Sequence, residues 1–257
     1  MTVYLVGAGP GSPDLLTLRA ARLLAAADIV VHDRLVDPRI LEMAPPTATV
    51  IDAGKYPGGP SDAQAHINVV LVDAARRAAV VVRLKGGDPY VFGRGGEEAV
   101  ALRSAGVEVE VVPGVSSAIA GPAAAGIPVT MRGLSSGFTV VTGHQDPAGT
   151  DPLDWEALAR LGTTLVVLMG ASRAATIADR LLTAGMAPAT PVAAVESATS
   201  VEQRVLRSRL DELADLAEGT IQAPAVLVVG EVAGLDVADA EFGALVSEMA
   251  SETGGGR

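Results

Sequence analysis

The sequence predicts an α/β protein made of two α/β domains, the first with a mostly parallel sheet and the second with a mixed sheet. Short apolar runs alternate with helix-patterned segments through the first 112 residues, which is typical of a parallel sheet. About five further strand candidates follow at closer, hairpin-like spacing, beyond a segment bounded by proline and glycine that is typical of a domain boundary. We therefore expect domains at 1–113 and 114–235, and an acidic tail, partly disordered, at 236–257.

The first domain is expected to hold five strands and three helices. The strands are short buried-type runs rich in valine, leucine and isoleucine, and the helices carry apolar residues at helical spacing. Gly106 closes the last of these helices. The expected strands are 3–6, 29–31, 49–51, 80–84 and 107–112, and the expected helices are 15–27, 64–79 and 97–105.

The second domain follows from the same patterns. A segment of small residues opens it, and an extended piece with a proline, 127–130, comes next. Gly185 closes the longest of its later helices. The expected strands are 138–142, 163–169, 191–195, 202–208 and 225–230, and the expected helices are 116–125, 155–161, 174–184 and 210–217.

Composition and charge limit the possible functions. The chain has 257 residues, of which 49% are hydrophobic but only 3% aromatic, so its core must be built from aliphatic side chains. The net charge of -11 disfavours general nucleic-acid binding and attachment to an anionic membrane. An anionic small substrate stays possible, because a local basic cleft is enough to bind it.

Other classes are excluded by what the sequence lacks. There is no cysteine, so neither a disulfide nor a thiolate metal site is expected, and His32, His66 and His144 lack metal-ligand spacing. The N-terminus enters a strand at once instead of a signal peptide, and no apolar run reaches the about 18 residues of a membrane span. We expect a soluble cytoplasmic protein without a metal.

The stretch 82–98 is the most informative part of the chain. It joins an apolar strand to a glycine-dense turn in which Gly86 and Gly87 permit unusual backbone conformations and close approach of a ligand. Asp88 follows, beyond the carboxyl end of the strand, where open α/β sheets bind their ligands. The stretch therefore predicts a ligand-binding loop; the alternative is a purely structural connection between a strand and a helix.

A second glycine-rich turn, at 7–14, resembles a dinucleotide-binding fingerprint but fails it. The third glycine of that fingerprint would fall at Ser12, and Pro10 interrupts the amides that would face a pyrophosphate. A nicotinamide oxidoreductase is therefore disfavoured. Taken alone, this turn is equally well explained as a tight structural connection.

Four isolated residues are candidates for chemistry, each with a plainer alternative. Asp33 follows a strand and is either a functional carboxylate or a solvated one that pairs with Arg34. Lys55 lies in an irregular loop and is otherwise a surface lysine. His144 lacks an acidic partner nearby, which favours a structural role, and Met169 is otherwise core filler.

Together these motifs resemble the uroporphyrinogen-III C-methyltransferases, within the wider tetrapyrrole methylases. The similarity runs from about residue 3 to 232, and without an extra dehydrogenase-ferrochelatase domain at the N-terminus the chain is similar to the stand-alone enzymes. The motifs that carry it are 7–11, 33–36, 54–55, 82–98, 111–118, 126–128, 142–144 and 223–225.

The resemblance implies a homodimeric enzyme with S-adenosylmethionine in a cleft between two α/β domains. It implies two methyl transfers, to C2 and C7 of uroporphyrinogen III, giving precorrin-2 for sirohaem or cobalamin. Asp33 matches the proton acceptor of these enzymes and Lys55 the proton donor. The matched S-adenosylmethionine-binding residues are Pro10, Gly86, Gly87, Asp88, Val91, Ser116, Ser117, Met169 and Ala198.

The substrate of these enzymes carries eight carboxylates, so an acidic protein must concentrate basic side chains around it. By position the candidates are Lys55, Arg34, Arg94 and Arg132, and Lys55 is either an anchor for a carboxylate or a proton donor. The sequence departs from the family pattern where it has His32, Tyr56, Met131 and Ala198.

Two alternatives share the expected scaffold. One is a methylase of a later precorrin, which the arginine- and glycine-rich run 92–98 disfavours. The other is a non-catalytic carrier of a tetrapyrrole or nucleotide, which the presence of both Asp33 and Lys55 disfavours.

Overall fold

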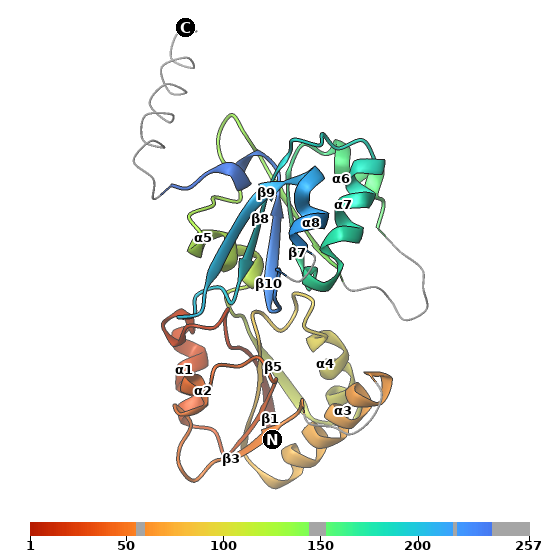
Figure 1. The fold of residues 1–257 in the computed structure, drawn as a ribbon. Coiled ribbons are helices and arrows are strands. Elements are labelled where there is room, and N and C mark those ends of the chain that lie inside the picture. The colour runs from red at the N-terminus through yellow and green to blue at the C-terminus, as the bar shows by residue number, and fades with distance from the viewer. Residues whose placement is uncertain (55–59, 144–152, 218–219, 238–257) are drawn as a thin grey trace, which may run out of the picture. The chain divides into compact units, whose positions relative to one another are not determined.

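The computed structural model describes residues 1–54, 60–143, 153–217 and 220–237. The chain divides into two compact units, Met1–Ser116 and Ser117–Arg257, each with its own five-stranded sheet (Figure 1). Lys55, Tyr56, His144 and all but the first two residues of the expected acidic tail lie outside the described residues.

The sheet of the first unit is entirely parallel, which confirms the prediction for this half. Its strand order is β3-β2-β4-β1-β5, so β4 lies at the centre. The register pairs Val6 of β1 with Leu84 of β4 on one side and with Val112 of β5 on the other. The strands are β1 (Thr2–Gly7), β2 (Ile29–His32), β3 (Thr49–Asp52), β4 (Val80–Lys85) and β5 (Glu108–Val112).

Helices cover both faces of this sheet (Figure 1). On one face, Leu24 and Ile40 pack with Val82 and other alternate strand residues; on the other, Leu71 and Leu102 pack with Val81 and its neighbours. The two faces follow from the alternation of side chains along a strand. The helices are α1 (Leu18–Ala25) and α2 (Pro38–Leu41) on the first face, and α3 (Pro60–Arg77) and α4 (Gly95–Ser104) on the second.

The sequence misplaced the starts of two helices in this unit and missed a third helix. The helix expected from residue 64 begins at Pro60. The helix expected from residue 15 begins at Leu18, because Pro13–Leu15 forms a separate 3-10 turn and the Thr17 side chain caps the helix by accepting from the Ala20 amide. The short helix Pro38–Leu41 was not expected. The Asp37 side chain caps this helix, and a proline occupies its first position. Because the helix has only four residues, this signal does not stand out in the sequence.

The sheet of the second unit is mixed, as expected. Its order is β6-β7-β10-β8-β9. Strands β6 and β7 are parallel, whereas β10 runs antiparallel to both of its neighbours and β9 runs antiparallel to β8. The strands are β6 (Phe138–Thr142), β7 (Thr164–Leu168), β8 (Pro191–Glu196), β9 (Arg204–Arg209) and β10 (Ala225–Val229).

The helices of the second unit also lie on both faces of their sheet (Figure 1). Ala118 of the first helix packs with Val166 and Val228, while Leu181 and Leu213 pack with Leu165 on the opposite face. The helices are α5 (Ser117–Ala124) on one face, and α6 (Trp155–Arg160), α7 (Ala174–Thr183) and α8 (Leu213–Ala217) on the other, with 3-10 turns at Ala171–Arg173, Leu210–Glu212 and Glu231–Gly234.

No helix in the described part of the chain combines the length and the apolar character needed to cross a membrane.

Candidate functional site

The carboxyl edge of the first sheet is built by loops that hydrogen-bond to one another. The loop after β1 meets the loop after β4, where the Gly9 amide donates to the Gly87 carbonyl at 3.2 Å and the Gly87 amide donates to the Gly9 carbonyl at 2.7 Å. Both residues have left-handed φ values, +73° and +65°, which glycine adopts at little cost. The two glycine-rich motifs therefore form one structure.

The glycines at this edge serve two different purposes. A Cβ on Gly114 would lie 2.2 Å from the Gly87 carbonyl oxygen, and one on Gly7 would lie 2.5 Å from the Gly114 Cα, so protein backbone fills the space beside both. At Gly86, by contrast, a Cβ would meet no protein atom within 4 Å, and the φ angle is not left-handed. At Gly86 the protein itself thus does not require glycine.

Asp88 organises this loop through its side chain. One carboxylate oxygen accepts from the Tyr90 amide at 2.8 Å, and the other accepts from the Gly114 amide at 3.0 Å. The carboxylate therefore ties the loop after β4 to the end of β5. Val91, in the exposed run that follows, is 37% exposed.

Arg94, a candidate for binding substrate carboxylates, is paired within its own segment. Its guanidinium donates to both oxygens of Glu97, at 2.9 Å and 2.7 Å. The hydrogen bond to Glu97 raises the pKa of Arg94, and the same bond lowers the pKa of Glu97. The other basic candidates in the described residues, Arg34 and Arg132, are exposed.

Asp33 lies where β2 ends, beside the centre of the sheet. Its amide donates to the Leu84 carbonyl at 3.1 Å, and its carboxylate receives a hydrogen bond from Arg83 at 2.5 Å. Lys85 Nζ lies 3.8 Å from the other oxygen. The alternative in which Asp33 pairs with its neighbour Arg34 is wrong, because the partner is Arg83 on the adjacent strand.

The residues around Asp33 form a buried charge cluster, which we define as Arg83, Lys85, Glu98 and Asp33. Arg83, Lys85 and Glu98 are 1%, 3% and 0% exposed. Oε1 of Glu98 accepts from Arg83 Nη2 and from Lys85 Nζ, both at 3.0 Å, and Gln64 of α3 reaches the same oxygen at 3.4 Å.

Burial and charge oppose each other in this cluster. Burial disfavours the charged form of Arg83, but the charges of Asp33 and Glu98 outweigh it and raise the pKa of Arg83. Burial, together with the charge of Arg83, lowers the pKa of Lys85. The sequence analysis missed this cluster. A signal was available, because Arg83 and Lys85 lie two residues apart in an apolar strand, and lysine and arginine are almost never buried unless they are paired.

The second unit brings two further predicted residues to one edge of its sheet. Because β10 runs antiparallel between β7 and β8, pairing with Leu168 and with Glu196 near its start, the carboxyl ends of β7 and β8 lie at the same edge. Two ladder spacings separate them, roughly 10 Å. Met169 follows β7 directly, and Ala198 follows β8 by two residues.

The backbone at this edge is strained. Met169 has φ 55°, and Ser197 and Thr199, which flank Ala198, have φ 43° and 68°. Side chains other than glycine, asparagine and aspartate rarely adopt this region, and such outliers cluster at functional sites. Met169 is also 51% exposed, so the alternative that it is core filler is wrong.

Two hydrogen bonds hold this strained turn in place. The Ser197 amide donates to the Pro224 carbonyl at 2.9 Å. Glu196, only 3% exposed, accepts from the Gln222 amide at 2.7 Å. The turn is therefore anchored on the segment that leads into β10.

The remaining predicted residues lie at loop or helix starts. Pro10 follows Gly9 in the loop after β1, and Ser116 follows β5; both are half-buried. Ser117 is the first residue of α5 and belongs to the second unit. Each unit thus contains some of the predicted site residues, while Lys55 lies outside the described part of the chain.

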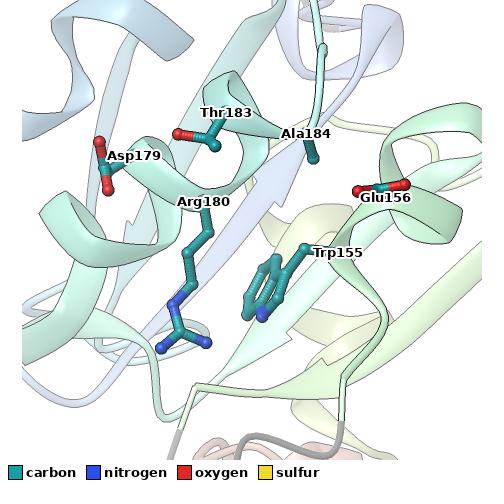
Figure 2. A pocket seen from close by; sticks show the side chains of 6 residues that line it. All are labelled: Trp155, Glu156, Asp179, Arg180, Thr183 and Ala184. Carbon is teal, nitrogen blue, oxygen red and sulfur yellow. The ribbon is translucent and has the colours of Figure 1, made fainter.

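A hollow on the second unit contains none of the predicted residues. Its volume is about 270 Å³. Arg180 of α7 extends toward Trp155 of α6, and its guanidinium carbon lies 5.6 Å from the centroid of the Trp155 ring (Figure 2). Such a cation–π contact stabilises the packing of two helices. The lining residues are Trp155, Glu156, Asp179, Arg180, Thr183 and Ala184.

Comparison with known proteins identifies the family. Residues 2–214 match the family described as tetrapyrrole (corrin/porphyrin) methylases. A Methanosarcina barkeri protein named S-adenosyl-L-methionine-dependent uroporphyrinogen III methyltransferase is 52% identical over 232 residues, which are 90% of this chain and 91% of that protein. The uroporphyrinogen-III C-methyltransferase of Pseudomonas aeruginosa is 51% identical, covering 90% of this chain and 93% of that one.

A solved structure agrees. The uroporphyrin-III C-methyl transferase from Thermus thermophilus, complexed with S-adenyl homocysteine, is 44% identical with a TM-score of 0.79, covering 92% of this chain and 99% of that one. The sequence match, the identity over nine tenths of the chain and the shared fold lead to one conclusion: the chain belongs to the tetrapyrrole (corrin/porphyrin) methylase family.

Proposed function

We propose that the protein is an S-adenosylmethionine-dependent C-methyltransferase that methylates uroporphyrinogen III at C2 and C7, giving precorrin-2 for sirohaem or cobalamin. The observation that carries this proposal is the 52% identity, over 90% of the chain, with a protein named for that activity. The site is compatible with it, since the half-exposed Asp33 carboxylate can accept a proton and the open backbone at Gly86 leaves room for a ligand.

The described residues fit the methyl donor. The open backbone at Gly86 admits a close ligand, and each oxygen of Asp88, which accepts one backbone bond, has a further lone pair for a ligand hydroxyl or ammonium. When bound, the donor supplies an electrophilic methyl group. The residues that would hold it are Pro10, Gly86, Gly87, Asp88, Val91, Ser116 and, from the second unit, Ser117, Met169 and Ala198.

Asp33 is proposed as the proton acceptor. Methylation of a pyrrole carbon obliges the ring system to lose a proton, and a positioned carboxylate accelerates such a transfer. The Asp33 side chain is 34% exposed, so it is reachable from the surface, while Arg83 holds one of its oxygens. Arg34 and Arg132, both exposed, are proposed to bind substrate carboxylates.

The proposal is tested by the mass of the product. The protein is incubated anaerobically with uroporphyrinogen III and S-adenosylmethionine, and the product is analysed by mass spectrometry. A gain of two methyl groups supports the proposal. Methylation of a later precorrin alone would assign the protein to a different step, and donor or tetrapyrrole binding without any methylated product would make it a carrier.

Gly86→Ala is expected to lower donor affinity at least tenfold without lowering stability. The added methyl meets no protein atom within 4 Å, so only a ligand that approaches the backbone would be displaced by it. Calorimetric titration with S-adenosylhomocysteine and a thermal melt measure the two effects. The matched control is Gly137→Ala, whose Cβ would lie 3.4 Å from Thr163; equal affinities in both variants would exclude Gly86 from the site.

Lys55→Ala is expected to reduce activity in one of two ways. If Lys55 donates a proton, kcat falls; if it anchors a substrate carboxylate, KM for uroporphyrinogen III rises while kcat is kept. Steady-state kinetics separate the two roles, and unchanged kcat and KM would remove both.

A homodimer in the cytoplasm is also proposed, by analogy with the family. Light scattering after size exclusion is expected to give a mass of about twice 25.9 kDa. A single-chain mass at micromolar concentration would contradict the dimer.

A further inference from the structure

The central strand of the first sheet carries two cations where its pattern calls for core residues. Arg83 and Lys85 are two residues apart on β4, so their side chains leave the same face of the sheet. Val81, two residues earlier on that face, packs with Leu71 of α3 and Leu102 of α4. The apolar layer under α3 and α4 thus gives way to charge at the carboxyl end of the strand.

Such burial is tolerated only with counter-ions of good geometry. Glu98 provides one counter-ion from the first turn of α4. Its Oε1 accepts hydrogen bonds from both cations, whereas its buried Oε2 has no partner among the described residues. Glu98 is fully buried and so cannot touch a substrate. Asp33, the other anion, is the one member of the cluster with substantial exposure.

Arg83 links the buried anion to the exposed one. Its Nη2 donates to Glu98 at 3.0 Å and to Asp33 at 2.5 Å, and its Nε donates to Glu98 at 3.2 Å. Its Nη1 faces the carbonyls of Val31 and Leu84, at 3.5 Å and 3.4 Å. All three guanidinium nitrogens therefore have acceptors, which fixes the orientation of the group.

We propose that Arg83, held by Glu98, is a positioning residue that keeps the Asp33 carboxylate aimed at the proton it accepts. The inference rests on the proposed role of Asp33 in methyl transfer. Arg83 is 1% exposed, so it acts through Asp33 and not on the substrate. The planar fork of arginine is needed, because a lysine ammonium cannot hold both carboxylates in a fixed geometry.

A double-mutant cycle tests the proposal. Arg83→Lys is expected to lower kcat about 10–100-fold, since misplacement of a catalytic group by about 1 Å has effects of this size. In an Asp33→Asn background the same change should lower kcat less than about twofold, because residues that act as a unit are not additive. A merely structural role for Arg83 predicts the same fold-loss in both backgrounds, and that result would overturn the proposal.

The experiment includes a control for incomplete folding of the variants. Calorimetric titration with S-adenosylhomocysteine counts binding-competent molecules, so kcat is expressed per folded site. Arg103→Lys is the matched control, because Arg103 is exposed at the end of α4; its kcat should equal that of the wild type.

Glu98→Gln is the second variant, for the case that Arg83→Lys does not fold. It keeps the shape of the side chain but removes the charge that holds Arg83. It is expected to lower kcat, and again to have no further effect when Asp33 is already asparagine. Wild-type kcat in Glu98→Gln, or an equal loss in both backgrounds, would overturn the proposal.

The outcomes separate this inference from the function on which it rests. Absence of methylated product from the wild type contradicts the proposed function. Normal kcat in Asp33→Asn contradicts the role of Asp33 and the inference with it. Loss of kcat in Asp33→Asn together with additive losses for Arg83→Lys contradicts the inference alone.

Discussion

Replacing Asp33 by asparagine is expected to lower kcat by about 10²–10⁴-fold, the usual contribution of a positioned proton acceptor. Asparagine has nearly the same shape and can still accept the hydrogen bond from Arg83, but it cannot take a proton. The change therefore removes the chemistry while leaving much of the local geometry.

The measurement is steady-state methylation of uroporphyrinogen III under anaerobic conditions, alongside titration with S-adenosylhomocysteine. Donor affinity should stay at the wild-type value. Asp73→Asn is the control, since Asp73 is a half-exposed residue that pairs with Arg77 along α3, and its turnover should be unchanged. A kcat for Asp33→Asn within about threefold of the wild type would show that another group accepts the proton.

Gly114→Ala is expected to destabilise the first unit by about 3 kcal/mol, the upper part of the range for overpacking. The new Cβ would lie 2.2 Å from the Gly87 carbonyl oxygen and 2.7 Å from the Gly7 Cα. All the crowded atoms belong to the backbone, so no side chain can rotate away. The strain falls on the amide that donates to Asp88, so donor binding should weaken as well.

Thermal unfolding tests this prediction. A loss of about 3 kcal/mol corresponds to a fall of roughly 6–12 °C in Tm for a chain of this size. Gly86→Ala, in which the same methyl group meets open space, should melt like the wild type. Equal melting temperatures for Gly114→Ala and Gly86→Ala would show that the contact among Gly7, Gly87 and Gly114 is not tight in solution.

Regular patterns made the fold predictable. The strand 80–84 was recognisable because four of its five residues are valine or leucine, between a helix and a glycine turn, and the structure places it at the sheet centre as Val80–Lys85. The mixed second sheet followed from its hairpin-like spacing. The ends of helices and strands were harder to predict. At Leu18, for example, a proline turn and a capping side chain determine within a few residues where the helix begins.

The charge cluster was not predictable in the same way. Arg83 and Asp33 are 50 residues apart, and Glu98 lies 15 residues beyond Arg83. Their contact depends on which strands are neighbours and on which face of the sheet α4 packs, and neither is encoded locally. For the same reason the sequence offered only Arg34, a neighbour along the chain, as a possible partner of Asp33, although the strand order places Arg83 beside it.

The left-handed backbone at Met169 places thermal stability in conflict with activity. A side chain in that region destabilises the fold by about 1–2 kcal/mol relative to glycine. Glycine at this position would therefore be favoured by any selection for heat resistance alone, and would delete the thioether from the edge where Ala198 also lies. Thermostable variants of this protein obtained without an activity screen are thus expected to lose the Met169 side chain, which we propose contacts the donor, before other predicted site residues.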